Sequence, residues 1–275
     1  NERFGGARAD RIGVSGAVFK CISGTVEEMK VADPCGCFPS GRHYPGIAHL
    51  LKVRAVGVAS ELDASASWVD QPIAFLDVET TGRNPAVDRV VEVAVVIGRG
   101  GEVVARHSWL IHPGRPIPPE VTSVHGIKDA DVADKPPFAV VAGDILAALA
   151  GAIPAAYNAV FDRGFLLSEL ERAQVFPENP PPAMRREVDW LDPLTFAREL
   201  YKHEDSRALS EMASLLGISL VNAHRATDDA EAALQVLYAL AKDSRVPKAY
   251  GSFVHEQRRL LRIQDEARSR WRRPN

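Results

Sequence analysis

The spacing of hydrophobic positions changes near residue 136, which divides the chain into a strand-rich stretch and a later helix-rich stretch. In the first stretch, apolar and β-branched residues form short runs that are separated by turn residues, as is typical of strands. Three strands are expected, at residues 73–78, 88–98 and 102–111, and the short loops between them favour an antiparallel meander. A proline-rich loop is expected next, at residues 113–120.

Beyond Pro136 the apolar residues recur at intervals of three and four, which is the spacing of one face of a helix. The first such helix is expected to end at Gly151, and a short apolar strand follows it at 152–157. Four further helices are expected, at 159–174, at 189–201, at 208–216, and from Asp228 or Asp229 to Ala241. This order of strands, helix, strand and helices predicts an α/β domain with a mixed sheet.

Residues 1–71 differ in composition from the rest and are expected to form an N-terminal segment of unknown fold and role. Their charges balance, with eight Lys and Arg against eight Asp and Glu. A candidate Zn²⁺ ligand set lies in this segment and consists of Cys35, Cys37, His43 and His49. The single residue between the two cysteines is tighter than the usual spacing of zinc ligands. The alternative is a proline-flanked turn whose thiols bind no metal.

The main domain is expected at residues 72–243, and residues 244–275 are expected to form a basic amphipathic helix. An apolar stripe of this helix falls at helical spacing and consists of Leu260, Ile263, Ala267 and Trp271. Two interpretations are open. The helix packs on the domain with a solvated arginine face, or that face binds phosphate or a partner.

Composition and charge exclude few classes of function. The 275 residues are 46% hydrophobic and 25% charged, which is ordinary for a globular protein. The net charge of −3 gives no global signal for nucleic acid, but a local basic stripe is enough to bind it. No stretch has the apolar length of a membrane helix or signal peptide, and three cysteines do not indicate a disulfide framework. A cytoplasmic protein that does not contact a membrane is expected.

The first expected strand carries the chemistry that stands out most. Successive side chains of a strand point to opposite faces, so Asp77 and Glu79 share one face while Leu76 and Val78 share the other. Two adjacent carboxylates repel each other unless a cation lies between them or one of them is protonated. Oxygen ligands of this kind suit Mg²⁺ or Mn²⁺. The alternative is a strand end with two solvated acids.

Two later motifs favour the metal site. Together with the strand that carries the two acids, they make three motifs. In chain order these are Phe75-Leu76-Asp77-Val78-Glu79-Thr80-Thr81-Gly82, Tyr157-Asn158-Ala159-Val160-Phe161-Asp162-Arg163-Gly164-Phe165-Leu166 and His224-Arg225-Ala226-Thr227-Asp228-Asp229-Ala230. With these three motifs in this order, the chain resembles the DEDDh (DnaQ-like) exonucleases. That family includes RNase T and the epsilon-type proofreading subunit of bacterial DNA polymerase III. The resemblance covers residues 73–241, about three-fifths of the chain.

The resemblance implies a ribonuclease-H-like fold with a five-stranded mixed sheet flanked by helices. It also implies four acids that bind two divalent cations, Mg²⁺ or Mn²⁺, and these are Asp77, Glu79, Asp162 and Asp229. His224 is implied as the general base, since an imidazole can accept a proton from water near neutral pH.

The spacing of five residues between His224 and Asp229 places the two side chains on different faces of one regular helix. We therefore expect His224 in the loop before that helix and Asp229 in its first turn. Thr227 or Asp228 is the expected N-cap, and Asp228 with Glu231 has the spacing of a capping box. The adjacent Asp228 is the weaker metal-ligand candidate, because the family's spacing selects Asp229.

The resemblance also implies substrate contacts. Thr80 and His125 match positions that contact the terminal nucleotide, and Asn158 matches a polar position beside the active site. The family often has His where this chain has Tyr157, so no polar role is assigned to Tyr157.

The expected function is therefore that of a metal-dependent 3′→5′ exonuclease that releases nucleoside 5′-monophosphates from DNA, in proofreading or repair. Its expected partners are single-stranded DNA with a free 3′ end and a DNA polymerase. One alternative is an RNA-trimming exonuclease of the RNase T or oligoribonuclease kind. The other is a binding or scaffold module of a polymerase. No Gln-x-x-Leu-x-Phe clamp-binding peptide occurs in the sequence.

Overall fold

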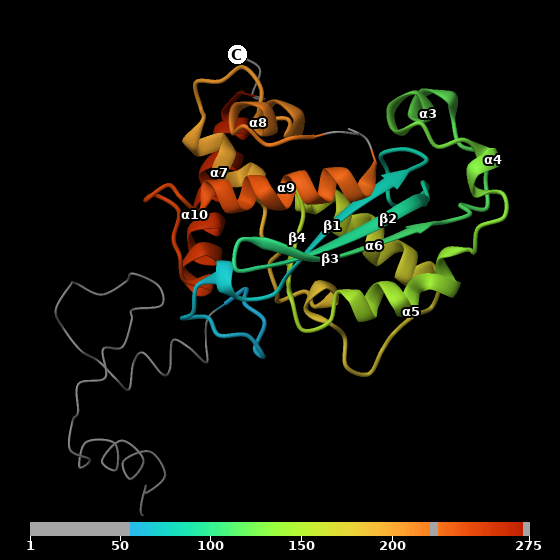
Figure 1. Ribbon diagram of the computed structural model, residues 1–275, viewed down its shortest axis with the longest axis horizontal. Helices are drawn as coiled ribbons and strands as arrows, with labels where there is room; N and C mark the ends of the chain where they lie inside the picture. Colours follow the sequence, from blue (N-terminus) through green and yellow to red (C-terminus); the bar gives the residue numbers. More distant parts are fainter. Residues whose placement is uncertain (1–55, 221–224, 272–275) are drawn as a thin grey trace, which may run out of the picture.

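The computed structural model describes residues 56–220 and 225–271, which form an α/β domain around a four-stranded mixed sheet (Figure 1). The strands are β1 (Ile73–Thr80), β2 (Val90–Arg99), β3 (Glu102–Leu110) and β4 (Ile153–Ala155). Their order in the sheet is β3-β2-β1-β4. The first three strands are antiparallel neighbours, and β4 lies parallel to β1. The expected meander is confirmed, as is the short fourth strand.

Helices cover both faces of the sheet. The helices of the described residues are α3 (Pro119–His125), α4 (Asp129–Val132), α5 (Phe138–Ala148), α6 (Ala159–Arg172), α7 (Pro193–Leu200), α8 (Leu209–Leu215), α9 (Ala226–Leu240) and α10 (Tyr250–Trp271), with 3-10 turns η1 (Trp68–Asp70) and η2 (Pro182–Met184). Phe75 and its neighbours on one face pack with Leu234 and Leu237 of α9. Leu76 on the opposite face packs with Phe165 of α6 and Ile145 of α5. The result is a three-layer sandwich (Figure 1).

This layering decides where the acids of β1 point. Leu76 and Val78 belong to the core beneath α5 and α6. Because strand side chains alternate, Asp77 and Glu79 project from the α9 face. The expectation that these two acids share one face is therefore confirmed.

The expected fifth strand is absent from the described residues and is replaced by a single parallel bridge between Ala155 and Leu191. The N–H of Leu191 donates to the Pro154 carbonyl at 2.9 Å, and the N–H of Ala156 donates to the Leu191 carbonyl at 3.1 Å. Pairing stops there because α7 begins at Pro193, with the Asp192 side chain accepting from the Leu194 N–H at 3.0 Å. The helix predicted at 189–201 therefore begins four residues later in the structure, at Pro193.

Two helix starts differ from expectation. The expected proline-rich loop leads into α3, which has Pro119 in its first turn and ends at Gly126 in the left-handed region with φ 76°. The predicted N-cap of α9 was wrong. The N-cap position is occupied by Arg225, whose side chain makes no capping hydrogen bond. Glu231 does not close a capping box but pairs with Arg106 of β3 at 2.7 Å.

The first half of α10 is part of the core. Tyr250, Phe253, Val254 and Leu260 are buried with Trp68 of η1, whose Nε1 donates to the Pro247 carbonyl at 2.9 Å. The expected apolar stripe was wrong at Ile263, which is 47% exposed, and at Ala267, which is also exposed. The face of α10 that meets the domain instead includes Gln257 and Gln264. Their side-chain amides donate hydrogen bonds to the backbone carbonyls of Trp190 and of Thr195.

Several expectations lie beyond what the structure describes. Cys35, Cys37, His43 and His49 fall outside the described residues, as does His224. The division of the chain at residues 72 and 244 stays a prediction. Within 56–220 and 225–271, no helix is both long enough and apolar enough to cross a membrane.

Candidate active site

Three carboxylates converge at the end of β1. Asp77 and Glu79 come from the strand, and Asp229 comes from the first turn of α9, which crosses the same face. One oxygen from each lies within 4.8 Å of the others, so the three groups can hold a metal ion. The placement of Asp229 in the first helical turn is confirmed. Carboxylates at this separation are a donor set that suits a hard divalent cation.

The fourth expected acid, Asp162, reaches the same strand from α6. It is buried in the first turn of that helix, and its Oδ1 accepts a hydrogen bond from the Val78 N–H at 3.1 Å. Val78 lies between Asp77 and Glu79 in the sequence, so this bond ties the fourth acid to the centre of the motif. The Asp162 carboxyl lies outside the group of three oxygens within 4.8 Å.

Asp77, Glu79 and Asp162 have pKa values above those of free carboxyl groups. Burial raises the pKa of Asp77 well above its usual range, and Asp229 and Glu92 raise it further. Burial likewise raises the pKa of Asp162, with a further contribution from Asp77. Burial, together with the charges of Asp77 and Asp229, raises the pKa of Glu79 to about 9. Ionising this cluster therefore requires compensating positive charge, which divalent cations supply.

Glu92 of β2 is a fifth acid, and the sequence analysis missed it. It is 1% exposed and lies directly opposite Glu79 in the β1–β2 ladder. Its Oε1 accepts from Arg225 Nη2 at 3.2 Å and from Ser108 Oγ at 3.1 Å. The signal that would have found it is a single charged residue within the apolar run 90–97. A buried acid needs partners, and these come from β3 and from the start of α9.

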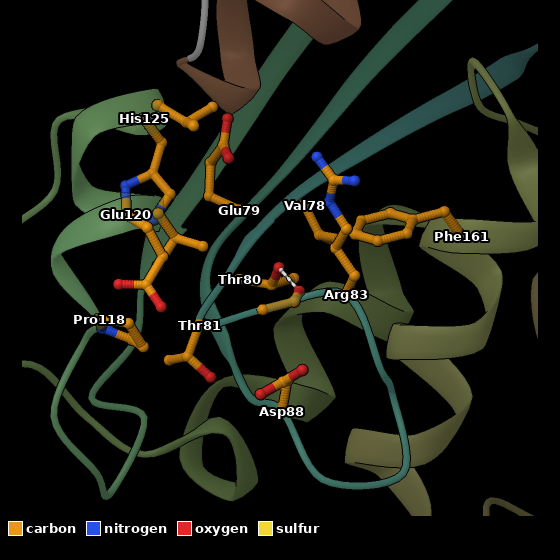
Figure 2. A pocket seen from close by; sticks show the side chains of 13 residues that line it. Val78, Glu79, Thr80, Thr81, Arg83, Asp88, Pro118, Glu120, His125 and Phe161 are labelled. Carbon is orange, nitrogen blue, oxygen red and sulfur yellow. Dashed lines mark hydrogen bonds between the residues drawn. The ribbon is translucent and has the colours of Figure 1, made fainter.

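A pocket of about 610 Å³ opens beside the acids (Figure 2). Figure 2 shows Glu79 and Thr80 on one side, His125 and Glu120 from α3 on another, and Phe161 of α6 on a third. The Thr80 hydroxyl donates to the Gly82 carbonyl. His125 Nδ1 accepts from the Ile127 N–H at 3.0 Å, which fixes the orientation of the buried imidazole. The structure thus brings two of the three expected substrate residues together.

The third expected substrate residue, Asn158, lines a different cavity. It has a left-handed backbone, with φ 70°, immediately before α6. Its N–H and that of Ala159 donate to the Asp192 carboxylate at 3.0 and 3.2 Å. The neighbouring Tyr157 donates its hydroxyl to the Arg207 carbonyl at 2.6 Å and so holds the loop before α8.

The mixed sheet, with carboxylates at the end of its first strand and α9 over that face, agrees with the ribonuclease-H-like fold that the resemblance implied. Residues 74–237 match the family model described as Exonuclease (RNase_T), which is more than half of the chain. The chain belongs to this exonuclease family, as its three motifs predicted.

Curated relatives with similar sequences are polymerases. The chain is 30% identical over 222 residues to the PolC-type DNA polymerase III of Streptococcus thermophilus strain LMD-9, covering 75% of this chain and 14% of that protein. It is 31% identical over 183 residues to the enzyme of the same name from Listeria monocytogenes, covering 66% of this chain and 12% of that protein. The chain therefore corresponds to a small part of each of these relatives.

Solved structures agree on the fold. A structure of exonuclease I has a TM-score of 0.55 and 21% identity, covering 64% of this chain and 42% of that one. The zinc-bound complex of E. coli exonuclease I with single-stranded DNA has a TM-score of 0.56 and 21% identity, covering 64% of this chain and 41% of that one. These likenesses support the ribonuclease-H-like fold, with four strands among the described residues.

Proposed function

We propose that this protein is a metal-dependent 3′→5′ exonuclease that releases nucleoside 5′-monophosphates from single-stranded DNA. The observation that carries the proposal is the convergence of Asp77, Glu79 and Asp229, with oxygens within 4.8 Å of one another. Asp162 completes the set of four acids, since it is held against the same strand through Val78. These four residues are proposed to hold two divalent cations, Mg²⁺ or Mn²⁺.

Two divalent cations held by these acids would supply an activated water and would stabilise the leaving 3′-oxygen. Side chains of the protein are proposed to accept the proton of the attacking water and to orient the substrate. His224 is proposed to take the proton from the attacking water, a role that rests on the family resemblance. Thr80 and His125 are proposed to orient the terminal nucleotide in the adjoining pocket, whose volume of about 610 Å³ accommodates one nucleotide.

Single-stranded DNA is the proposed substrate for two reasons. The relatives with similar sequences are named as DNA polymerases, and exonuclease I has been solved with single-stranded DNA. The same names support a polymerase as partner, for proofreading or repair. RNA is the competing substrate class, and a scaffold without activity is the competing role.

The test is a cleavage assay with 5′-labelled single-stranded DNA and matched RNA, each with Mg²⁺, Mn²⁺ or EDTA. The expected result is a metal-dependent ladder that shortens from the 3′ end and is lost in Asp77→Asn. Asp144→Asn, which removes an exposed acid from α5, serves as the matched control and should keep full activity. Preferential cleavage of RNA would replace the proposed substrate, and no cleavage of either polymer would favour the scaffold role.

A further inference from the structure

We propose that the cavity between α6, α7 and α10 is a second anion-binding site that takes a backbone phosphate of the nucleic-acid strand. The choice of a nucleic-acid strand rests on the proposed function. The cavity has a volume of about 440 Å³. Its polar lining comes from α7, from α10 and from the residues that precede α6 and α7, and it includes Asn158, Asp192, Arg198, Asp265 and Arg268.

Arg198 is the central group of this site. It lies half-buried in the last turn of α7, and no residue within 56–220 and 225–271 accepts a hydrogen bond from its guanidinium. Burial lowers the pKa of Arg198. The charge of Asp192 opposes this decrease, and the charges of Arg268 and Arg207 add to it. A half-buried guanidinium beside two like charges is unfavourable without an anion. Asp192 supplies a nearby negative charge, but the guanidinium of Arg198 keeps donors that an anion can bind.

The acids that line the cavity are already engaged. The Asp192 carboxylate accepts from the backbone N–H groups of Asn158, Ala159 and Leu194 at 3.0, 3.2 and 3.0 Å. Asp265 pairs with Arg268 at 2.6 Å, one helical turn away, and both side chains are largely exposed. Asp192 attracts Arg198 electrostatically but makes no ion pair with it. Donors of Arg198 and of Arg268 thus remain available to an incoming anion.

Phosphate is the anion that fits best. The planar guanidinium presents paired N–H donors that match phosphate oxygens, and two arginines from separate helices can bind one phosphate from two sides. The lining also includes Leu261 and Val160, whose side chain is 83% exposed. These two apolar groups offer a surface for a sugar or a base beside the phosphate.

The position of the cavity selects a nucleic-acid strand. Asn158 in its lining immediately precedes α6, and Asp162 at the acidic cluster lies four residues further on. One helical turn separates them, about 6 Å along the helix axis. A strand whose 3′ end lies at the carboxylates can therefore place another of its phosphates between Arg198 and Arg268. Of the two interpretations of the C-terminal helix, the proposal therefore favours phosphate binding by its arginine face, through Arg268.

The test measures binding without catalysis. The full chain would be titrated in EDTA against 5′-fluorescein-labelled dT20 at several salt concentrations. Arg198→Gln and Arg268→Gln should each weaken binding about fivefold, and the slope of log K against log salt should fall by about 0.7 per arginine removed. Arg259→Gln is the matched control, because Arg259 is also an exposed α10 arginine paired with an acid three residues away. It should change the affinity less than about twofold.

Equal losses in Arg259→Gln and Arg268→Gln would overturn the site in favour of a diffuse charge effect. If Arg198→Gln fails to fold, the exposed Arg268→Gln decides the result alone. A parallel titration with dTMP, whose phosphate is a monoester, tests whether the cavity binds a phosphodiester within a strand or a terminal phosphate. Weaker dTMP binding in Arg268→Gln would overturn the assignment to the strand. Because no cleavage is measured, arginine-dependent binding stands even if the proposed hydrolysis fails.

Discussion

Glu79 and Glu92 face each other directly across the β1–β2 ladder. Like charges in this position destabilise an antiparallel pair unless one of them is compensated. Here Arg225 supplies the compensation, through Nη2 at 3.2 Å and Nε at 3.4 Å from the Glu92 carboxylate. The charge of Arg225 also opposes the increase in the pKa of Glu79. One ion pair thus links β2, the acidic site and the residue that caps α9.

Arg225→Gln should therefore destabilise the fold. It leaves the buried Glu92 without its cation, and the expected loss in the free energy of unfolding is about 1–3 kcal/mol. Urea unfolding in EDTA would measure it. Arg106→Gln is the control, because the Arg106–Glu231 pair also joins the sheet to α9 but is exposed. That substitution should cost about 0–1 kcal/mol. Equal losses of stability in the two variants would show that the effect of Arg225→Gln does not come from the burial of Glu92.

The acids should make the stability of the metal-free protein fall with pH. The pKa of Glu79 is raised from 4.5 to about 9, so the folded state retains a proton that the unfolded state releases. The stabilising effect of that proton is complete below pH 4.5 and is lost as the pH rises to about 9. Asp77 and Asp162, whose pKa values are also raised, act in the same direction.

Urea unfolding at several pH values between 5 and 9, in EDTA and in Mg²⁺, would test this. The decline expected in EDTA should be smaller in Mg²⁺, because a bound cation compensates the ionised carboxylates. Asp77→Asn should flatten the decline in EDTA, since it removes one of the repelling charges. Identical profiles with and without Mg²⁺ would contradict the assignment of a metal site.

Asp162→Asn should separate the two roles of this side chain. An amide oxygen can still accept from the Val78 N–H, so the variant should keep its thermal stability. The loss of the negative charge should lower kcat about 10²- to 10³-fold. Asp162→Ala, in contrast, leaves a buried N–H without an acceptor and should also cost about 1–3 kcal/mol of stability. Full activity in Asp162→Asn would exclude it as a metal ligand.

Val124→Asp should weaken substrate binding by repulsion. Val124 of α3 is exposed and lines the pocket next to Glu79, where the terminal nucleotide is proposed to lie. An added carboxylate there should raise KM for single-stranded DNA by about fivefold, corresponding to roughly 1 kcal/mol. The effect should shrink at high salt. Val140→Asp, on an exposed position of α5, should leave KM unchanged, and a similar increase there would contradict the placement of the substrate.

The sequence by itself determined the local geometry of the site. Alternation along residues 73–80 was enough to put Asp77 and Glu79 on one face, because that periodicity belongs to any strand. The five-residue spacing to His224 was enough to put Asp229 in a first helical turn. The order of the three motifs identified the family before any contact was visible.

Only the tertiary structure decided what those groups meet. It paired Glu92 with Arg225 across 133 positions of sequence, reduced the fifth strand to a bridge at Leu191, and exposed Ile263. It also brought Arg198 and Arg268 to one cavity. Periodicity reports which side of an element is apolar, but it does not report which surface covers that side. Long-range ion pairs, bridges and cavities depend on that covering surface, so they follow from packing rather than from spacing.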